Sequence, residues 1–208
     1  MTNTLGRRPL FGLIAAAATL LPGMSLAQAG GPVAVIQRLN DGLLQIMKEG
    51  DRTPFTQRVA QLAPVVDAAL DVPAILRLAV GPAWSTLTPA QQASLLSAFR
   101  NYTVATFVEN FDSYDGQRLT VSPQTRALPG GAQVVHTQVI SRSGLATHSI
   151  DYVMRNGARG WQASDILADG TISRVAVLRS DFAAMLASGG APALEASLQR
   201  KTAALASG

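Results

Sequence analysis

The sequence contains no cysteine among its 208 residues. This absence excludes a disulfide-stabilised scaffold, a catalytic thiol and any metal site built on cysteine. Charged residues are also few, at 14% of the chain, and aromatic residues make up only 5%, whereas hydrophobic residues make up 48%. A domain this apolar has enough hydrophobic side chains to line a cavity as well as to fill a core.

Histidine is equally scarce, with His136 and His148 as the two copies. Their even spacing in a region of alternating polarity places them on neighbouring predicted strands, and no carboxylate cluster accompanies them. A metal site is one interpretation, and a hydrogen-bonded or half-exposed sheet position is the favoured one. The chain also lacks a phosphate-binding loop, a dinucleotide fingerprint, a nucleophile elbow and a zinc-binding histidine pair on a helix. Sequence motifs therefore give no indication of catalysis.

The N-terminal segment has the three-part order of a secretory signal peptide. Arg7 and Arg8 supply a positive charge, an apolar run covers residues 10–21, and Ala27-Gln28-Ala29 is a small-residue cleavage signal. The apolar run has about a dozen residues, fewer than the roughly 20 that a membrane-spanning helix needs. We predict that residues 1–29 are a cleaved signal peptide, with an uncleaved membrane anchor as the alternative.

Residues 30–208 are predicted to form a single soluble domain in the periplasm, large enough to have its own hydrophobic core. Removal of Arg7 and Arg8 leaves 15 of the 17 basic residues against 13 acidic residues, and no run of basic residues remains. Nucleic acid is therefore not an expected partner. The Arg-Arg pair leaves both the general and the twin-arginine export routes open.

The first half of the predicted domain has the apolar spacing of helices. Four helices are predicted: Pro32 to Gly50; a second after Thr53 as N-cap, with Pro54 in its first position; a short third capped by Asp71; and a fourth from a capping box at Thr88 to about Asp112. After Gly116 the period changes to that of strands. Four strands are predicted, over residues 119–125, 133–140, 146–154 and 160–167.

Short turns join the predicted strands, and Asn156-Gly157 gives the strongest hairpin signal. Strands joined by such short turns form an antiparallel meander, because parallel strands need long crossovers. Residues 172–187 are predicted to form a strand-to-helix or helical segment, and after a break at Gly189-Gly190 a terminal helix is predicted over residues 191–205. The predicted fold class is α+β, a curved antiparallel sheet of about four strands packed against several helices.

One enzymatic interpretation remains open from the residues alone. Asp165 follows Trp161 on the fourth predicted strand, and Asp151 lies nearby in the predicted sheet. An acid facing into a helix-backed sheet is the arrangement of a ketosteroid-isomerase-like pocket, where a carboxyl group works through a raised pKa. The other alternative is a non-catalytic periplasmic adaptor with a filled core.

Several short motifs follow one another in a characteristic order between about Pro32 and Lys201. They are Arg58 with Leu62-Ala63-Pro64; Gly81-Pro82-Ala83-Trp84; Leu87 to Gln92 with Phe99 and Tyr102; Asp151-Tyr152; Trp161 with Asp165; Asp169 to Ser173; Arg179 to Phe182; and Gly189-Gly190. Their order and spacing resemble those of the MlaC, or toluene-tolerance, family of periplasmic lipid carriers. Two stretches, Phe111 to Gly116 and Asp169 to Arg174, resemble the hopanoid-associated branch called HpnM.

The resemblance implies a carrier with no enzymatic activity and no cofactor, and a weakly charged monomer is the default expectation for its oligomeric state. Such a carrier holds the acyl chains of one membrane lipid in an apolar cavity between its sheet and its helices. It moves the lipid between an inner-membrane ABC-type transport complex and an outer-membrane partner. The implied cargo is a phospholipid or, in the HpnM branch, a hopanoid. A dry cavity suits this task, because each buried methylene group contributes about 0.8 kcal/mol.

Strand alternation and helix faces give the predicted lipid-binding residues. These are Val135, Val139, Ile150, Tyr152 and Met154 on the sheet, and Phe99, Phe107, Val175 and Leu178 on the helices. Ordinary core packing is the alternative at each position. Trp84 and Trp161 are interpreted as structural. Arg179 is expected to pair with Asp165 or Asp169 and so to fix the junction between sheet and helix, with contact to a lipid head group as the alternative.

Overall fold

The computed structural model describes Met1 and residues 30–207. Apart from Met1, the predicted signal peptide lies outside the described residues, so it stays a prediction. Within the described part, no helix is both long enough and apolar enough to cross a membrane.

Five α-helices and five strands make up the described part of the chain. The helices are α1 (Pro32–Glu49), α2 (Phe55–Ala69), α3 (Val72–Val80), α4 (Pro89–Asn110) and α5 (Arg174–Leu205). The strands are β1 (Arg118–Ala127), β2 (Gln133–Ile140), β3 (Ala146–Gly157), β4 (Gly160–Ala168) and β5 (Ile172–Ser173). Three 3-10 helices, η1 (Gly50–Arg52), η2 (Gly81–Thr86) and η3 (Pro129–Gly131), complete the list.

The strands form one antiparallel sheet in the order β1-β2-β3-β4-β5, which confirms the α+β class and the predicted meander. The sheet has five strands among the described residues, not the four predicted. The additional strand is only two residues long, with Ile172 and Ser173 paired to Ala168 and Leu167. A strand this short has no alternation that a sequence pattern can detect.

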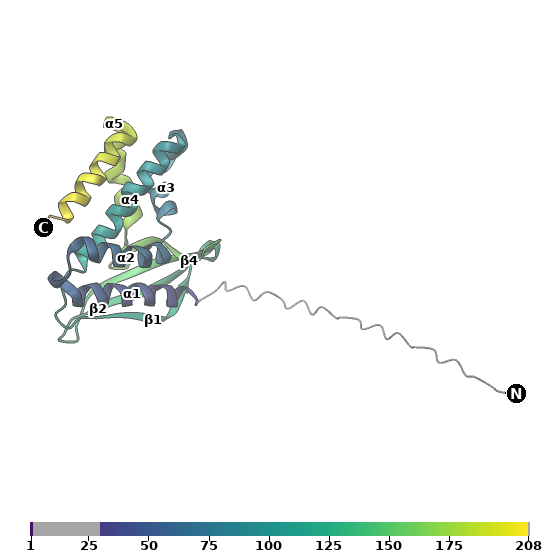
Figure 1. The fold of residues 1–208 in the computed structure, drawn as a ribbon, viewed down its shortest axis with the longest axis vertical. Helices are drawn as coiled ribbons and strands as arrows, with labels where there is room; N and C mark the ends of the chain where they lie inside the picture. Colours follow the sequence, from purple (N-terminus) through teal and green to yellow (C-terminus); the bar gives the residue numbers. More distant parts are fainter. Residues whose placement is uncertain (2–29, 208) are drawn as a thin grey trace.

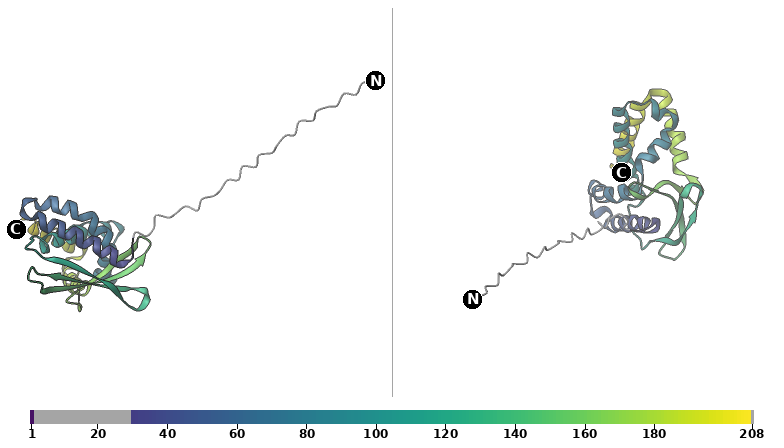
Figure 2. Two further views of the ribbon diagram at one scale, coloured as in Figure 1. Left: turned by 90° about the horizontal axis from the view of Figure 1, so that it is seen from below. Right: turned by 90° about the vertical axis from the view of Figure 1, so that its right-hand side faces the viewer.

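The helices are arranged in two groups around the sheet. Figures 1 and 2 show α1 and α2 lying along the sheet, while α4 and α5 extend away from it. Helix α5 breaks at Gly189-Gly190, as predicted, and Gly190 has a φ of 63°. The second half of α5 then returns beside α4, where it buries Leu194 and Leu198.

Local side-chain caps fix where several helices begin. Asp71 accepts a hydrogen bond from the Ala74 amide at 3.1 Å, which confirms its predicted capping role. Thr88 and Gln91 form the predicted capping box. The predicted Thr53 cap is wrong, because Thr53 closes the 3-10 turn η1 through its own amide and Pro54 takes the N-cap position of α2.

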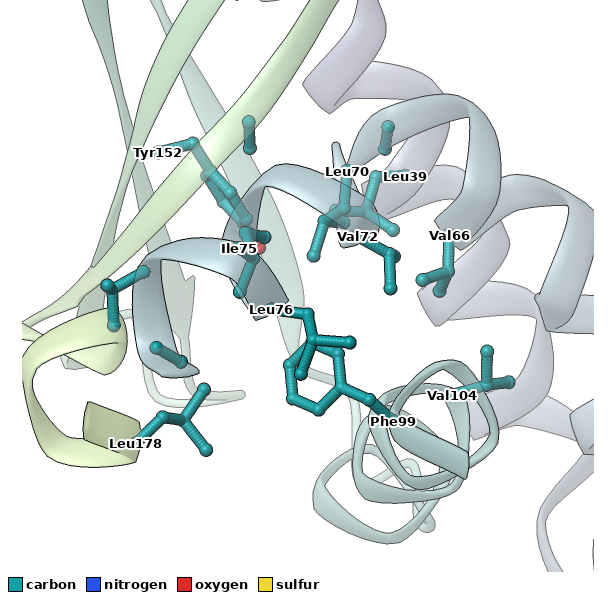
Figure 3. Packing of buried hydrophobic residues seen from close by; sticks show 14 of the residues in the cluster. Leu39, Val66, Leu70, Val72, Ile75, Leu76, Phe99, Val104, Tyr152 and Leu178 are labelled. Atoms are coloured by element: carbon teal, nitrogen blue, oxygen red, sulfur yellow. The ribbon is translucent and has the colours of Figure 1, made fainter. Parts of the chain in front are cut away.

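One hydrophobic core joins all five helices to the sheet. Figure 3 shows labelled side chains from α1 to α5 and from β3 converging in this core. Phe99 on α4 packs edge-to-face against Phe182 on α5, with ring centroids 6.0 Å apart. Trp84 and Trp161 pack partly buried against the same core, consistent with a structural role.

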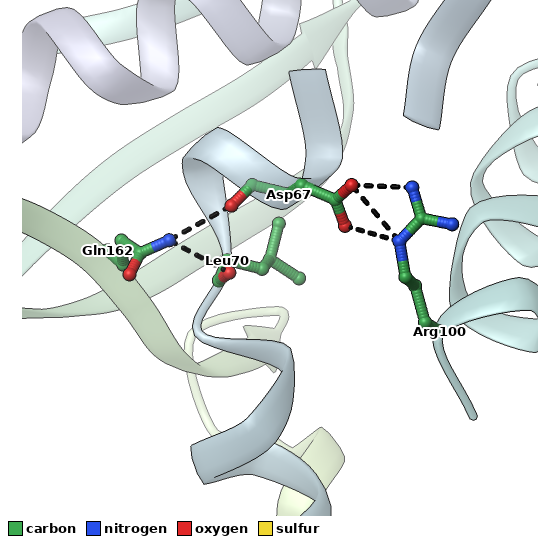
Figure 4. Close-up of polar contacts among 4 residues, drawn as sticks. All are labelled: Asp67, Leu70, Arg100 and Gln162. Atoms are coloured by element: carbon green, nitrogen blue, oxygen red, sulfur yellow. Dashed lines mark hydrogen bonds and ion pairs between the residues drawn. The ribbon is translucent and has the colours of Figure 1, made fainter. Parts of the chain in front are cut away.

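Polar contacts at the end of α2 hold this helix to α4 and to β4 (Figure 4). Asp67 forms an ion pair with Arg100 of α4, with Nε of Arg100 2.8 Å from Oδ1 of Asp67. The Gln162 side chain of β4 donates to the carbonyl oxygens of Asp67 at 3.0 Å and of Leu70 at 3.1 Å. These carbonyl groups lie where the helix ends and its own amides no longer reach them.

Candidate functional site

A partly open cavity of about 470 Å³ lies where α3, α4 and the beginning of α5 meet strands β3 to β5. Its size is within the range of small-molecule pockets, roughly 300–1,000 Å³. Its lining is mainly apolar and consists of Leu70, Val72, Ile75, Phe99, Tyr102, Thr103, Thr106, Phe107, Asn110, Phe111, Ile150, Tyr152, Asp165, Ile166, Ala168, Ile172, Arg174, Val175, Val177 and Leu178.

The cavity has a buried part and a solvent-facing part. The residues of the buried part are at most 5% exposed: Leu70, Val72, Ile75, Phe99, Tyr152 and Leu178. On the solvent-facing part, Ile172 is 56% and Val177 is 38% exposed. An apolar ligand can therefore bury one end among aliphatic and aromatic side chains while its other end remains in contact with water.

The structure places six of the nine predicted lipid-binding residues on the cavity wall. These six are Phe99, Phe107, Ile150, Tyr152, Val175 and Leu178. They lie on α4, α5 and β3, on the faces that helix spacing and strand alternation indicate.

The other three, Val135, Val139 and Met154, lie outside the cavity lining. Val135 and Met154 are completely buried core residues, and Val139 is half-buried on β2 between Leu119 and His148. The physical reason is the position of α1, which packs against β1 and β2 and covers that part of the sheet. Alternation identifies the inner face of a strand but not which helix covers it.

Sequence reasoning missed the contribution of α3 to the cavity, namely Val72 and Ile75 together with Leu70 before it. Leu70 makes an isolated parallel bridge with Ala163 on β4, and the Asp71 amide donates to the Ala163 carbonyl at 2.9 Å. These contacts hold the beginning of α3 against the sheet. No local sequence signal reveals a pairing across so many residues.

The threonine hydroxyl groups in the cavity wall offer no free hydrogen-bond donor to a ligand. Thr103 donates to the Phe99 carbonyl and Thr106 to the Tyr102 carbonyl, each at 2.8 Å. A hydroxyl bonded to the preceding helical turn is not a free donor toward a ligand. The Tyr152 hydroxyl remains neutral, because burial raises its pKa.

Asp165 also lines the cavity, but its carboxylate is engaged by the junction between β4 and α5. Oδ1 accepts the amides of Ile166 at 2.8 Å and Val175 at 3.0 Å, and Oδ2 accepts the Ser173 hydroxyl. The expected pairing of Arg179 with Asp165 or Asp169 is wrong. Arg179 instead donates twice to the Leu78 carbonyl and so ties α5 to α3.

Asp151, unlike Asp165, does not line the cavity. Its Oδ1 lies 2.6 Å from Nδ1 of His136 on the neighbouring strand, so His136 occupies the hydrogen-bonded sheet position favoured above. Asp151 itself is buried. Across the described residues, no group of three or more His, Cys, Asp or Glu side chains is placed to hold a metal ion.

The model of the MlaC protein family matches residues 37–200. The chain belongs to the MlaC family. Every residue of the cavity lining falls inside the matched region. The MlaC fold is also seen in a phospholipid-binding protein from Ralstonia solanacearum, whose structure was solved in complex with a phospholipid. That protein is 24% identical, with a TM-score of 0.70, and the similarity covers 85% of this chain and 99% of that one.

Proposed function

We propose that this member of the MlaC family is a periplasmic lipid carrier without enzymatic activity. The observation that carries the proposal is the partly open cavity, whose buried part is lined by apolar side chains. Burial of ten methylene groups of an acyl chain contributes roughly 8 kcal/mol. A cavity of this kind therefore removes the main barrier to moving a membrane lipid through water.

The cargo that fits best is a phospholipid. The similar Ralstonia solanacearum protein was solved in complex with a phospholipid, and its fold is similar, with a TM-score of 0.70. A hopanoid is the second candidate, favoured by the sequence stretches that resemble the HpnM branch. The family membership and the predicted signal peptide favour the periplasm. We also propose an inner-membrane ABC-type complex and an outer-membrane protein as partners of a monomeric carrier.

Two other function classes fit the structure less well. An isomerase-like enzyme needs Asp165 or Asp151 to act on a substrate. Three hydrogen bonds direct the Asp165 carboxylate to the backbone and to Ser173, and Asp151 lies outside the cavity lining beside His136. A structural adaptor needs no cavity, and an unused cavity in a hydrophobic core lowers the stability of the fold. A lipid carrier accounts for both observations.

The experiment is the transfer of a fluorescent phospholipid from donor to acceptor vesicles by the mature protein. We expect the wild-type protein to accelerate transfer and Ile150→Glu to slow it by at least about tenfold, because a carboxylate in an apolar cavity disfavours acyl chains. Ile150 lines the cavity and is half-buried. The matched control is Leu145→Glu, which places the same charge on a residue that is 69% exposed and outside the lining.

Circular dichroism and thermal melting show whether each variant is folded. A wild-type protein that accelerates the transfer of neither this phospholipid nor a labelled hopanoid contradicts the carrier proposal. A folded Ile150→Glu variant with the wild-type rate removes Ile150 from the binding surface.

A further inference from the structure

We propose that Arg174 and Tyr102 form an anion-binding subsite at the open side of the cavity, which binds the phosphate of a phospholipid head group. This inference rests on the proposed lipid-binding function and selects the class of lipid. It predicts that a phosphate-bearing lipid is preferred over an uncharged lipid with the same apolar part.

Arg174 is a half-buried cation in the wall of an otherwise apolar cavity. A guanidinium group has five N–H donors. Within residues 30–207, the one hydrogen bond of the Arg174 side chain is from Nη2 to the Tyr102 hydroxyl, at 3.4 Å, and no carboxylate pairs with it. Several donors on this side chain are therefore available to a ligand.

Asp165 is the one acidic residue in the lining of the same cavity and is therefore the candidate for a counter-charge. Asp165 forms no ion pair with Arg174, and both of its carboxylate oxygens accept hydrogen bonds from the junction between β4 and α5. Its role is to hold the first turn of α5 in place. The charge of Arg174 thus remains uncompensated by direct contact.

A second cation lies near Tyr102. The ammonium group of Lys201 is 5.9 Å from the centroid of the Tyr102 ring, and Lys201 is exposed. Helix α5 supplies both cations, because its second half returns beside α4 after the break at Gly189-Gly190 (Figure 1). Neither cation pairs with an acid in the described part of the chain.

This arrangement matches the chemistry of a phosphate group. Arginine binds phosphate oxygens through two parallel N–H donors, with strong charge assistance. The Tyr102 hydroxyl can accept the hydrogen bond from Arg174 and donate its own proton to a phosphate oxygen. The neighbouring Ile172 and Val177 are exposed, so a head group bound here stays at the water boundary while acyl chains reach the buried part.

The test is native mass spectrometry of the delipidated mature protein with an equimolar mixture of phosphatidylglycerol and diacylglycerol of identical acyl chains. We expect the wild-type protein to prefer phosphatidylglycerol. We expect Arg174→Gln to reduce that preference by about tenfold to a hundredfold, the range of a charge-assisted hydrogen bond. Arg174→Lys should retain part of it, because the charge remains but the planar fork is lost.

The matched control is Arg77→Gln, an identical charge change on an exposed arginine of α3 that does not line the cavity. Arg77→Gln should leave the preference unchanged, and inorganic phosphate at the lipid concentration should neither bind nor compete. A folded Arg174→Gln variant with the wild-type preference overturns the subsite, and binding of inorganic phosphate in place of lipid overturns its assignment to a lipid head group. A wild-type protein that binds neither lipid contradicts the lipid-binding function itself.

Discussion

Tyr152 combines a place in the cavity wall with nearly complete burial. It is 1% exposed, pairs with Val135 and Ile166 on neighbouring strands, and lines the cavity. Burial raises the pKa of its hydroxyl above the value of about 10 that tyrosine has in an unfolded chain. Above pH 10 the unfolded chain therefore releases a proton that the native protein retains. The associated stability is fully present below about pH 10 and is lost as the pH rises.

We therefore predict that the free energy of unfolding of the wild-type protein falls more steeply with pH above about 10 than that of Tyr152→Phe. Urea denaturation at a series of alkaline pH values measures this difference. Tyr114→Phe is the matched control, because Tyr114 is 43% exposed, and it should keep the wild-type pH dependence. Equal pH dependence of the wild-type protein and Tyr152→Phe would show that the Tyr152 hydroxyl is not buried in solution.

At the level of single residues, the sequence predicted side-chain direction better than side-chain partners. Alternation placed Ile150 and Tyr152 on the inner face of β3, and both line the cavity in the structure. The pairing of Arg179 was wrong, because its partner is a backbone carbonyl, of Leu78, a hundred and one residues away. A backbone acceptor carries no side-chain signal that a sequence pattern can reveal.

At the level of elements, helix α2 depends on two polar contacts of different burial. Gln162 is 6% exposed and donates to carbonyl groups at the end of the helix. The Asp67–Arg100 ion pair joins α2 to α4, but its side chains are 36% and 40% exposed. Solvent weakens an exposed ion pair, whereas buried carbonyl groups without donors are destabilising.

We predict that Gln162→Met lowers the free energy of unfolding by about 1–3 kcal/mol, because it leaves carbonyl groups of α2 without a donor. Arg100→Met, the matched control, should lower it by at most about 1 kcal/mol. Urea denaturation at neutral pH measures both values. A larger loss for Arg100→Met than for Gln162→Met would contradict this ranking.

Most element boundaries could be predicted because their signals are local. Asp71, Thr88 and the Gly189-Gly190 break each act within a few residues, and the structure confirms them. The predicted start of α2 was wrong because Thr53 closes the 3-10 turn directly before the helix through its own amide. The bridge between Leu70 and Ala163 was missed because it joins distant segments.

At the level of the whole molecule, the cavity results from how the elements are placed. Helices α1 and α2 cover one part of the sheet, while α3, α4 and the start of α5 meet it elsewhere and leave a cavity. The sequence indicated an apolar cavity between sheet and helices. Its boundaries could not be predicted, because they depend on how α1 and α3 pack against the sheet.

The central claim is that the cavity holds one lipid molecule. The most direct measurement is native mass spectrometry of the protein exported with its own N-terminal segment in a host that makes both phospholipids and hopanoids, followed by denaturing lipid extraction. The account predicts one discrete adduct of lipid mass per chain, with phospholipid as the extracted species. A clean ligand-free mass, unchanged after incubation with liposomes, would contradict it.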